Sequence, residues 1–232
     1  MKHTFPWKTY TQNIIKKKNL EHLEAYYAKR ATEYEAVYAK PERQNDIVQL
    51  KKNLPPHFDN RTVIDLGCGT GYWTQAISQR ATSIAGFDIN EPMLQVAREK
   101  TYECPTSFAV RSYYDLKSLP HAYEGMFGGF IYSHVPKAFR VLFFRNLLSV
   151  LNPTGVGILL DNRFVEGSST PIYKYDVSGN SYQIRKLENG EQFEILKNFP
   201  ESDEWNYLSD LGISEWEYKE MTYYWILTFK IP

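Results

Sequence analysis

Several features that assign a protein to a broad functional class are scarce in this sequence of 232 residues. Only 2 cysteines occur, so the chain has no disulfide framework. Lys and Arg together number 27, as do Asp and Glu, and this balance argues against a broad nucleic-acid or membrane surface. No run of about 18 apolar residues occurs, and residues 1–12 contain no apolar segment typical of a signal peptide. We therefore expect a soluble, cytoplasmic protein.

Metal-ligand spacing and internal repeats are also absent from the sequence. The 5 histidines follow no pattern typical of a metal site: His3, His22, His57, His121 and His134. A chain of 232 residues fits one α/β domain with additions, because domains typically span about 100–200 residues. The hydrophobic content of 43% is sufficient to fill a core.

The most informative stretch runs from Val63 to Gly71 and reads Val-Ile-Asp-Leu-Gly-Cys-Gly-Thr-Gly. Strand-forming apolar residues lead into three glycines at alternate positions, and Trp73, Ala76 and Ile77 follow at helical spacing. This pattern predicts a buried strand, a tight turn and the start of a helix. Glycines can adopt positive φ and allow the backbone to approach a ligand, and a helix N-terminus offers unpaired N–H groups. Such a turn suits a polar, partly anionic small molecule at the carboxyl end of a sheet.

The glycine spacing distinguishes between cofactors. A dinucleotide-binding fingerprint reads G-x-G-x-x-G, whereas here the third glycine is already reached at Gly71. The pattern Asp-x-Gly-x-Gly-x-Gly resembles motif I of the class I S-adenosylmethionine-dependent methyltransferases. The resemblance implies that Gly67, Gly69 and Gly71 wrap the methionine end of S-adenosyl-L-methionine. It also implies that Asp65 helps to hold the amino group of this cofactor. A plain strand-to-helix turn is the alternative interpretation of the same residues.

The next predicted strand, residues 83–87, ends in a second acid. Asp88 lies about 20 residues beyond the glycines, where a carboxylate is placed to accept hydrogen bonds from both ribose hydroxyls. Asn90 is expected to cap the helix that follows. Ile89 and Met93 are expected to flank the adenine, with plain core packing as the alternative.

The residues after the third predicted strand, 106–110, depart from the family pattern. Related methyltransferases often have an acid there that accepts a hydrogen bond from the adenine amino group. The aligned position in this chain is Ser112. The resemblance therefore leaves Ser112 and the backbone of Tyr113 as the candidates for contact with the adenine.

Residues 19–40 are predicted to form one amphipathic helix, with Asn19 as its cap and Pro41 at its end. Tyr27, Arg30 and Tyr34 would lie on one face of this helix. The segment resembles the Tyr-Tyr…Arg-Ala…Tyr region of small-molecule methyltransferases, which folds over the bound cofactor. The resemblance implies that Arg30 pairs with the methionine carboxylate while the two tyrosines close the pocket. The alternative is a docking helix with tyrosines packed at its rim.

Tyr132-Ser133-His134 follows the fourth predicted strand, residues 126–131. The resemblance implies that this point faces the substrate, with Tyr132 at the cofactor and Ser133 and His134 at the acceptor. His134 is the candidate general base, because imidazole titrates near neutral pH. A histidine held by a backbone carbonyl is the alternative.

Polar residues also end the fifth predicted strand, residues 156–160. Asp161 and Arg163 are therefore candidates for binding the acceptor, and an ordinary loop start is the alternative.

The alternation of strands and helices, closed by a strand pair, predicts an α/β fold. We expect an open, mostly parallel seven-stranded sheet with helices on both faces, and the resemblance implies that the last strand inserts antiparallel to its neighbours. A single domain would span 1–232 in four parts: an N-terminal helical cap acting as a lid (1–55), a cofactor-binding core (56–164), an inserted hairpin flap (165–198), and a C-terminal helix with a strand pair (199–232). The flap, with an Asn-Gly turn, would cover the substrate side or form a dimer contact, so a homo-oligomer remains open.

The sequence thus predicts a methyltransferase that uses S-adenosyl-L-methionine and releases S-adenosyl-L-homocysteine. The acceptor would be a small molecule methylated at an O, N or C nucleophile, and no nucleic-acid or membrane partner is expected. Two alternatives remain. One is a catalytically silent S-adenosylmethionine-binding protein, and the other is an NAD-dependent oxidoreductase, which the glycine spacing opposes.

Overall fold

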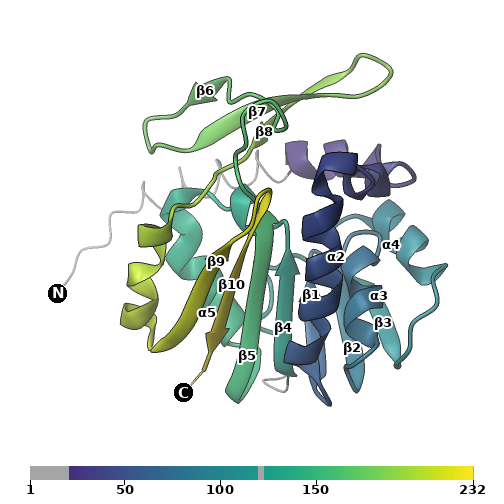
Figure 1. Ribbon diagram of the computed structural model, residues 1–232, viewed down its shortest axis with the longest axis vertical. Helices are drawn as coiled ribbons and strands as arrows, with labels where there is room; N and C mark the ends of the chain where they lie inside the picture. Colours follow the sequence, from purple (N-terminus) through teal and green to yellow (C-terminus); the bar gives the residue numbers. More distant parts are fainter. Residues whose placement is uncertain (1–20, 120–122, 232) are drawn as a thin grey trace.

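The computed structural model describes residues 21–119 and 123–231, and its main element is a seven-stranded sheet (Figure 1). The strand order is β3-β2-β1-β4-β5-β10-β9. Strands β1 to β5 run parallel, and β10 lies antiparallel between β5 and β9. This confirms the predicted sheet, including the inserted last strand. The strands are β1 Thr62–Leu66, β2 Ser83–Asp88, β3 Thr106–Val110, β4 Tyr123–Gly129, β5 Leu151–Asn162, β9 Glu215–Glu220 and β10 Tyr224–Lys230.

Helices cover both faces of this sheet (Figure 1). Side chains of a strand point alternately to opposite faces, so neighbouring residues of β1 enter different cores. Val63 packs with Leu50 of α2, whereas Ile64 packs with Phe143 of α5. The near-continuous apolar run of β1 follows from burial on both sides. The helices are α2 Gln44–Asn53, α3 Tyr72–Ser78, α4 Glu91–Arg98 and α5 Arg140–Leu148, with 3-10 segments η3 Pro55–Phe58, η4 Tyr132–His134, η5 Lys137–Phe139 and η6 Ser202–Leu211.

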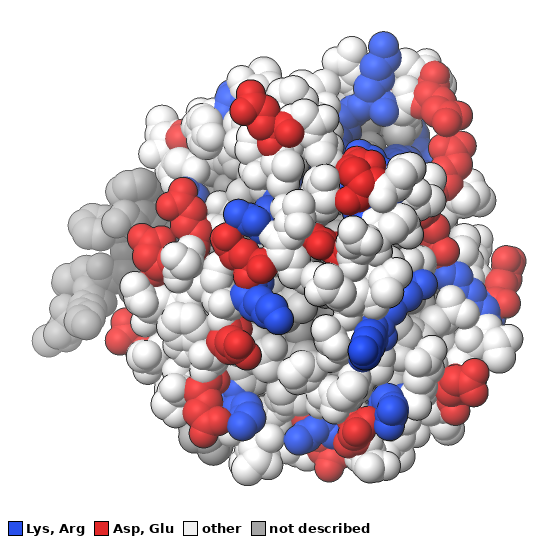
Figure 2. Space-filling view, in the orientation of Figure 1, with Lys and Arg blue, Asp and Glu red and all other residues white. Residues whose placement is uncertain are grey.

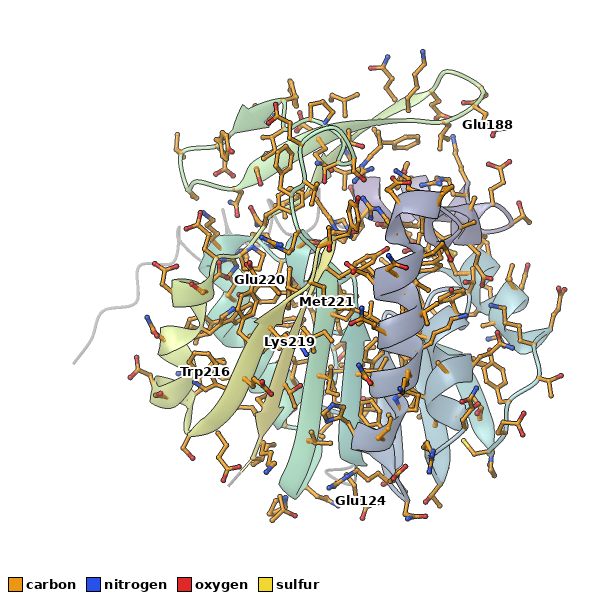
Figure 3. All side chains as sticks on the ribbon, viewed as in Figure 1. Glu124, Glu188, Trp216, Lys219, Glu220 and Met221 are labelled. Carbon is orange, nitrogen blue, oxygen red and sulfur yellow. The ribbon has the colours of Figure 1, made fainter. Side chains whose placement is uncertain are left out.

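A second, three-stranded sheet lies beyond the carboxyl ends of the parallel strands (Figure 1). It consists of β6 Lys174–Tyr175, β7 Ser181–Lys186 and β8 Gln192–Leu196, all antiparallel. The predicted hairpin is therefore confirmed, and Figure 3 labels Glu188 near its tip. Its connection spans residues 187–191 and contains Gly190 at φ 86°. We call residues 165–198 the flap.

The N-terminal segment differs from the single helix predicted over 19–40. Residues 21–28 are helical, but turns and the 3-10 segments η1 Tyr34–Tyr38 and η2 Pro41–Arg43 follow, while Asn19 lies outside the described residues. The reason is tertiary packing: the Tyr38 ring stacks on Tyr72 of α3 at a centroid distance of 4.1 Å. Aromatic burial against the core therefore outweighs the local helical pattern.

Two smaller predictions are also corrected. The fifth strand, predicted over 156–160, is longer: β5 begins at Leu151 and shifts register against β4 before Val156, with Thr154 at φ 65°. Asn90 precedes α4 in an extended conformation, but its side chain makes no capping hydrogen bond. Asn90 lines the pocket described next.

Candidate active site

The loop after β1 holds three glycines in the left-handed region, with φ of 66° at Gly67, 54° at Gly69 and 75° at Gly71. A Cβ at Gly67 would collide with Ile131, and one at Gly71 with Tyr102. A Cβ at Gly69 would meet no protein atom within 4 Å, so the loop leaves open space beside this residue. Only glycine combines this backbone conformation with access for a ligand.

Asp65, at the end of β1, is buried with one oxygen unsatisfied. Its Oδ2 accepts a hydrogen bond from Thr74 Oγ1 at 2.6 Å. Its Oδ1 has no hydrogen-bond partner within residues 21–119 and 123–231. Burial raises the pKa of this carboxyl to about 7, and the nearby Asp88 carboxylate adds to the increase. Buried polar atoms normally have partners, so Oδ1 indicates a donor supplied by a ligand.

Asp88, at the end of β2, is fixed by backbone N–H groups. Its Oδ2 accepts from Gly69 N at 2.9 Å, and its Oδ1 accepts from Asn90 N at 2.8 Å. Each carboxylate oxygen can accept more than one hydrogen bond, so both remain available to a pair of hydroxyls. Burial raises the pKa of Asp88 as well. A ligand that donates hydrogen bonds would stabilise its ionised form.

These residues line a cavity with about 750 Å³ of empty space, which we call the glycine-loop pocket. The glycine-loop residues that line it are Gly67, Cys68, Gly69 and Thr70. Polar groups and aromatic rings complete the lining, among them Asp65, Asp88, Asn90, Arg111, Tyr113, Tyr72, Trp73 and Phe130.

A second cavity, with about 830 Å³ of empty space, lies beside the first. The two share Tyr27, Tyr34, Tyr38, Phe130 and His134, which therefore form a common wall. We call this second cavity the basic pocket, because every charged residue among those that line it in the described ranges is basic. These residues are Arg30, Lys40, Arg43, Arg185 and Lys197.

His134 joins the common wall to the flap. Its Nδ1 lies 2.7 Å from the carbonyl oxygen of Leu196, and its Nε2 lies 3.0 Å from the hydroxyl of Tyr27. A carbonyl only accepts hydrogen bonds, so Nδ1 carries the proton and Nε2 accepts from Tyr27. Burial, with the Lys197 ammonium adding to it, lowers the pKa of His134 to about 3. The imidazole is thus neutral and has one fixed tautomer.

A fully buried polar cluster next to His134 consists of Ser133, Asp161 and Lys197. Lys197 Nζ donates to Asp161 Oδ1 at 2.8 Å and to Ser133 Oγ at 2.6 Å. Asp161 Oδ2 in turn accepts from the backbone N–H of Ser133 at 3.0 Å. Burial alone would raise the pKa of Asp161, but the Lys197 ammonium holds it below its usual range. The cluster therefore anchors the end of the flap to β5 through a buried ion pair.

Comparisons with known proteins find related sequences and related folds. A family model described as a methyltransferase domain matches residues 63–155. The chain is 24% identical over 156 residues to a demethylmenaquinone methyltransferase of Shouchella clausii, covering 61% of this chain and 64% of that protein. It is 30% identical over 117 residues to a demethylmenaquinone methyltransferase of Staphylococcus aureus, covering 48% of this chain and 46% of that protein. The chain thus spans less than two thirds of the length of these relatives.

Solved structures share the fold over nearly the whole chain. A structure titled "DhpI-SAH complex structure" has a TM-score of 0.77 and 24% identity, and the match covers 92% of this chain and 98% of that one. The chain has the Rossmann-like fold of the S-adenosylmethionine-dependent methyltransferases. In this fold the glycine loop and both acids lie where the sequence predicted them, at the carboxyl ends of β1 and β2.

Most residues predicted at the cofactor line the glycine-loop pocket. Four predicted residues do not: Gly71, Ser112, Arg30 and Tyr132, the last of which is described below. Gly71 shapes the loop from outside the lining, and the Ser112 hydroxyl accepts from Tyr114 N at 3.2 Å. Arg30 lines the basic pocket instead, with Nη1 2.6 Å from the Tyr26 hydroxyl. The predicted residues in the lining are Tyr27, Tyr34, Asp65, Gly67, Gly69, Asp88, Ile89, Met93 and Tyr113.

The predictions for Tyr132 and Arg163 need correction. Tyr132 is fully buried away from both pockets, against Trp205, and its hydroxyl contacts Glu204 and Tyr207. The 3-10 turn after β4 directs this ring into the core on the α5 side. Arg163 donates to the carbonyl of Met221 at 2.6 Å and pairs with Glu220 at 2.9 Å, at the β9–β10 turn labelled in Figure 3.

Two further acceptor candidates, Ser133 and Asp161, line neither pocket. Both instead accept hydrogen bonds from Lys197 Nζ. Of the acceptor candidates, only His134 reaches both pockets.

Sequence reasoning missed several residues of the site, among them Thr74, Arg111, Arg43, Arg185 and Lys197. Thr74 had a detectable signal, since it lies one turn into the helix that follows the glycines. The other four come from segments whose patterns are those of solvent-facing or strand residues.

Among the described residues, no His, Cys, Asp or Glu group could hold a metal ion, and no helix has the length and apolarity needed to cross a membrane.

Proposed function

We propose that this protein transfers a methyl group from S-adenosyl-L-methionine to a nucleophile of a small-molecule acceptor. One observation carries the proposal. A pocket with two buried carboxylates and a glycine loop adjoins a second pocket through the wall formed by Tyr27, Tyr34, Tyr38, Phe130 and His134. Two adjoining cavities suit a reaction that brings two small molecules together and needs no covalent enzyme intermediate.

The residues of the glycine-loop pocket fit S-adenosylmethionine. The unpaired Oδ1 of Asp65 would accept a hydrogen bond from the amino group of the methionine part. The Asp88 carboxylate would accept both ribose hydroxyls, and the open space at Gly69 admits the ligand against the backbone. Ile89, Met93 and Tyr113 would surround the adenine.

When bound, the cofactor supplies a methyl group already activated by a sulfonium. A lone pair of the acceptor would take this methyl group, the electron pair of the carbon–sulfur bond would stay on sulfur, and S-adenosyl-L-homocysteine would be the product. The protein must align the two molecules and exclude water. A proton leaves only where the acceptor atom carries one.

Tyr27 and His134 are proposed to position the acceptor. The neutral imidazole keeps Nε2 as an acceptor for the Tyr27 hydroxyl, which leaves the oxygen lone pairs of Tyr27 free to receive a hydrogen bond from the acceptor. A His134 pKa of about 3 argues against this residue as the primary general base.

Names of relatives support an acceptor of small size. The Shouchella clausii and Staphylococcus aureus relatives are demethylmenaquinone methyltransferases, and a Pseudomonas paraeruginosa protein, 47% identical over 38 residues, is a ubiquinone biosynthesis O-methyltransferase.

We also propose a cytoplasmic location, which cell fractionation would test.

The test is a screen for methylated products. Purified protein, S-adenosylmethionine carrying a deuterated methyl group and a broad acceptor panel should yield products heavier by that group in mass spectrometry. Asp88→Ala should abolish or strongly reduce the yield, whereas Asp59→Ala, which removes an exposed acid at the opposite end of β1, should not. Binding of S-adenosylhomocysteine without turnover of any acceptor would instead favour a silent binding protein.

A further inference from the structure

Resting on the proposed function, we propose that the acceptor carries an anionic oxyacid group, a carboxylate or a phosphate-type group, which the basic pocket binds through its guanidinium groups. The observation is a pocket lined by charges of one sign in a protein without net charge. Five basic residues line the cavity, and no Asp or Glu is among its described lining residues.

The face of the molecule in Figure 2 does not share this imbalance, because acidic and basic side chains are interspersed over it. The basic lining of this cavity is therefore a local feature. A cleft lined by charges of one sign concentrates counter-ions of the opposite sign.

The arginines of the basic pocket have only neutral partners in the described ranges. Arg185 Nη1 donates to Thr170 Oγ1 at 2.8 Å and its Nη2 to Gln183 Oε1 at 2.6 Å. Arg43 Nη1 and Nη2 donate to Asn162 Oδ1 at 3.0 Å and Ser168 Oγ at 3.1 Å. Side-chain oxygens hold both guanidinium groups in place without neutralising their charge.

Arg43 gives the clearest sign of a missing anion. Its side chain is only 8% exposed, and its Nε is buried without a hydrogen-bond partner in the described part of the chain. Its guanidinium lies over the rings of Tyr223 and Tyr224 at 5.3 and 5.6 Å, which restrains its position. Burying an uncompensated cation costs free energy, and an anionic ligand would remove this cost.

The neutral groups beside these arginines match an oxyanion too. Ser168, Ser169 and Thr170 line the same pocket, on the part of the flap between β5 and β6. Guanidinium forks with nearby hydroxyls bind carboxylate and phosphate oxygens through several charge-assisted hydrogen bonds. Lys197 is already paired with Asp161, so the arginines supply the available positive charge.

The basic pocket adjoins the glycine-loop pocket through the common wall, as a pocket for the acceptor should. An anion bound between Arg43 and Arg185 would place the rest of the acceptor toward Tyr27 and His134, which both pockets share. The charged group would thus act as an anchor that orients the nucleophile toward the methyl donor.

The experiment uses inorganic phosphate and acetate as probes, with chloride holding the ionic strength constant. Each is titrated by calorimetry into the full chain, with and without saturating S-adenosylhomocysteine. We expect saturable binding of at least one probe, weakened about tenfold or more by Arg185→Gln. Arg30→Gln serves as a second variant on a separate segment.

Arg163→Gln is the matched control, because it removes the same charge from a half-exposed arginine outside both pockets. It should leave probe binding within about twofold, and unfolding midpoints should show that all variants fold. In a paired acceptor panel, compounds bearing the oxyacid group should be methylated in preference to their neutral analogues.

Two outcomes separate this inference from the proposed function. If S-adenosylhomocysteine binds but neither anion binds, or if Arg163→Gln weakens the anions as much as Arg185→Gln does, the anionic acceptor is wrong and the proposed function stands. If S-adenosylhomocysteine does not bind the wild-type protein, the proposed function itself fails, and the inference about the acceptor fails with it.

Discussion

The hydroxyl of Tyr27 lies 3.0 Å from Nε2 of His134, although 107 positions separate the two residues in the chain. This hydrogen bond joins the segment that precedes the sheet to the turn that follows β4. Because both residues line both pockets, the bond fixes the wall across which the methyl group would pass.

Tyr27→Phe should therefore lower kcat about tenfold while changing the affinity for S-adenosylhomocysteine by less than about 1 kcal/mol. The variant keeps the ring contacts with Tyr26 and Tyr34 but leaves Nε2 of His134 without its donor. Steady-state kinetics and calorimetry check these values. Tyr175→Phe on the exposed β6 strand is the control, and an equal kcat in both variants would show that the bond does not matter.

Binding of the cofactor product should release a proton from Asp65. The pKa of this carboxyl is raised to about 7 from an ordinary 3.8, so below pH 7 it is largely protonated in the free protein. An amino cation beside Oδ1 would favour the carboxylate and lower that pKa. The affinity for S-adenosylhomocysteine should then rise with pH up to about 7 and level off above it.

Calorimetry between pH 5.5 and 8, in buffers with different ionisation enthalpies, measures this linkage. Asp65→Asn should remove the slope. A wild-type affinity that does not change across this pH range would argue against an amino group at Asp65. The raised pKa also means that the stability contributed by protonated Asp65 is full below about pH 4 and is lost as the pH rises through about 7.

Lys197→Met should destabilise the fold by about 3–5 kcal/mol, because it leaves Asp161 buried and unpaired. The double variant Lys197→Met with Asp161→Asn should recover part of this loss, since no buried charge then remains. Urea unfolding measures both. A single variant that costs less than about 1 kcal/mol would show that the pair is not buried in solution.

Local sequence signals were sufficient for the core of the site. Strand β1 and the glycines are contiguous, and Asp88 follows about 20 residues later. Each of these residue types has a distinct backbone or hydrogen-bonding requirement. The sheet followed for the same reason, because β1 to β5 show clear apolar runs bounded by turns.

The basic pocket could not be predicted in this way. Arg43 is the last residue of the 3-10 segment η2, Arg185 lies within a strand of the flap, and Lys197 follows β8, so only the tertiary fold brings them together. Tyr132 illustrates the opposite error. Its place at the end of β4 suggested the pocket, but the turn direction that buries it against Trp205 depends on long-range packing.

Gly69 and Gly71 should respond differently to the same substitution. Gly69→Ala should cost about 1–2 kcal/mol of stability from its positive φ, but reduce S-adenosylhomocysteine affinity more than tenfold, because its Cβ points into space reserved for the ligand. Gly71→Ala should cost more stability, since its Cβ collides with Tyr102. Thermal unfolding and calorimetry compare them. An unchanged affinity of Gly69→Ala for S-adenosylhomocysteine would show that the loop does not contact the ligand.

The central claim is that the glycine-loop pocket binds S-adenosylmethionine as a methyl donor. A crystal structure of the protein grown with S-adenosylhomocysteine tests it most directly. We predict the ribose hydroxyls on the Asp88 carboxylate, the amino group at Asp65 Oδ1, and the sulfur facing the wall of Tyr27 and His134. A pocket without ligand at saturating concentration, or a ligand bound away from both acids, would contradict the claim.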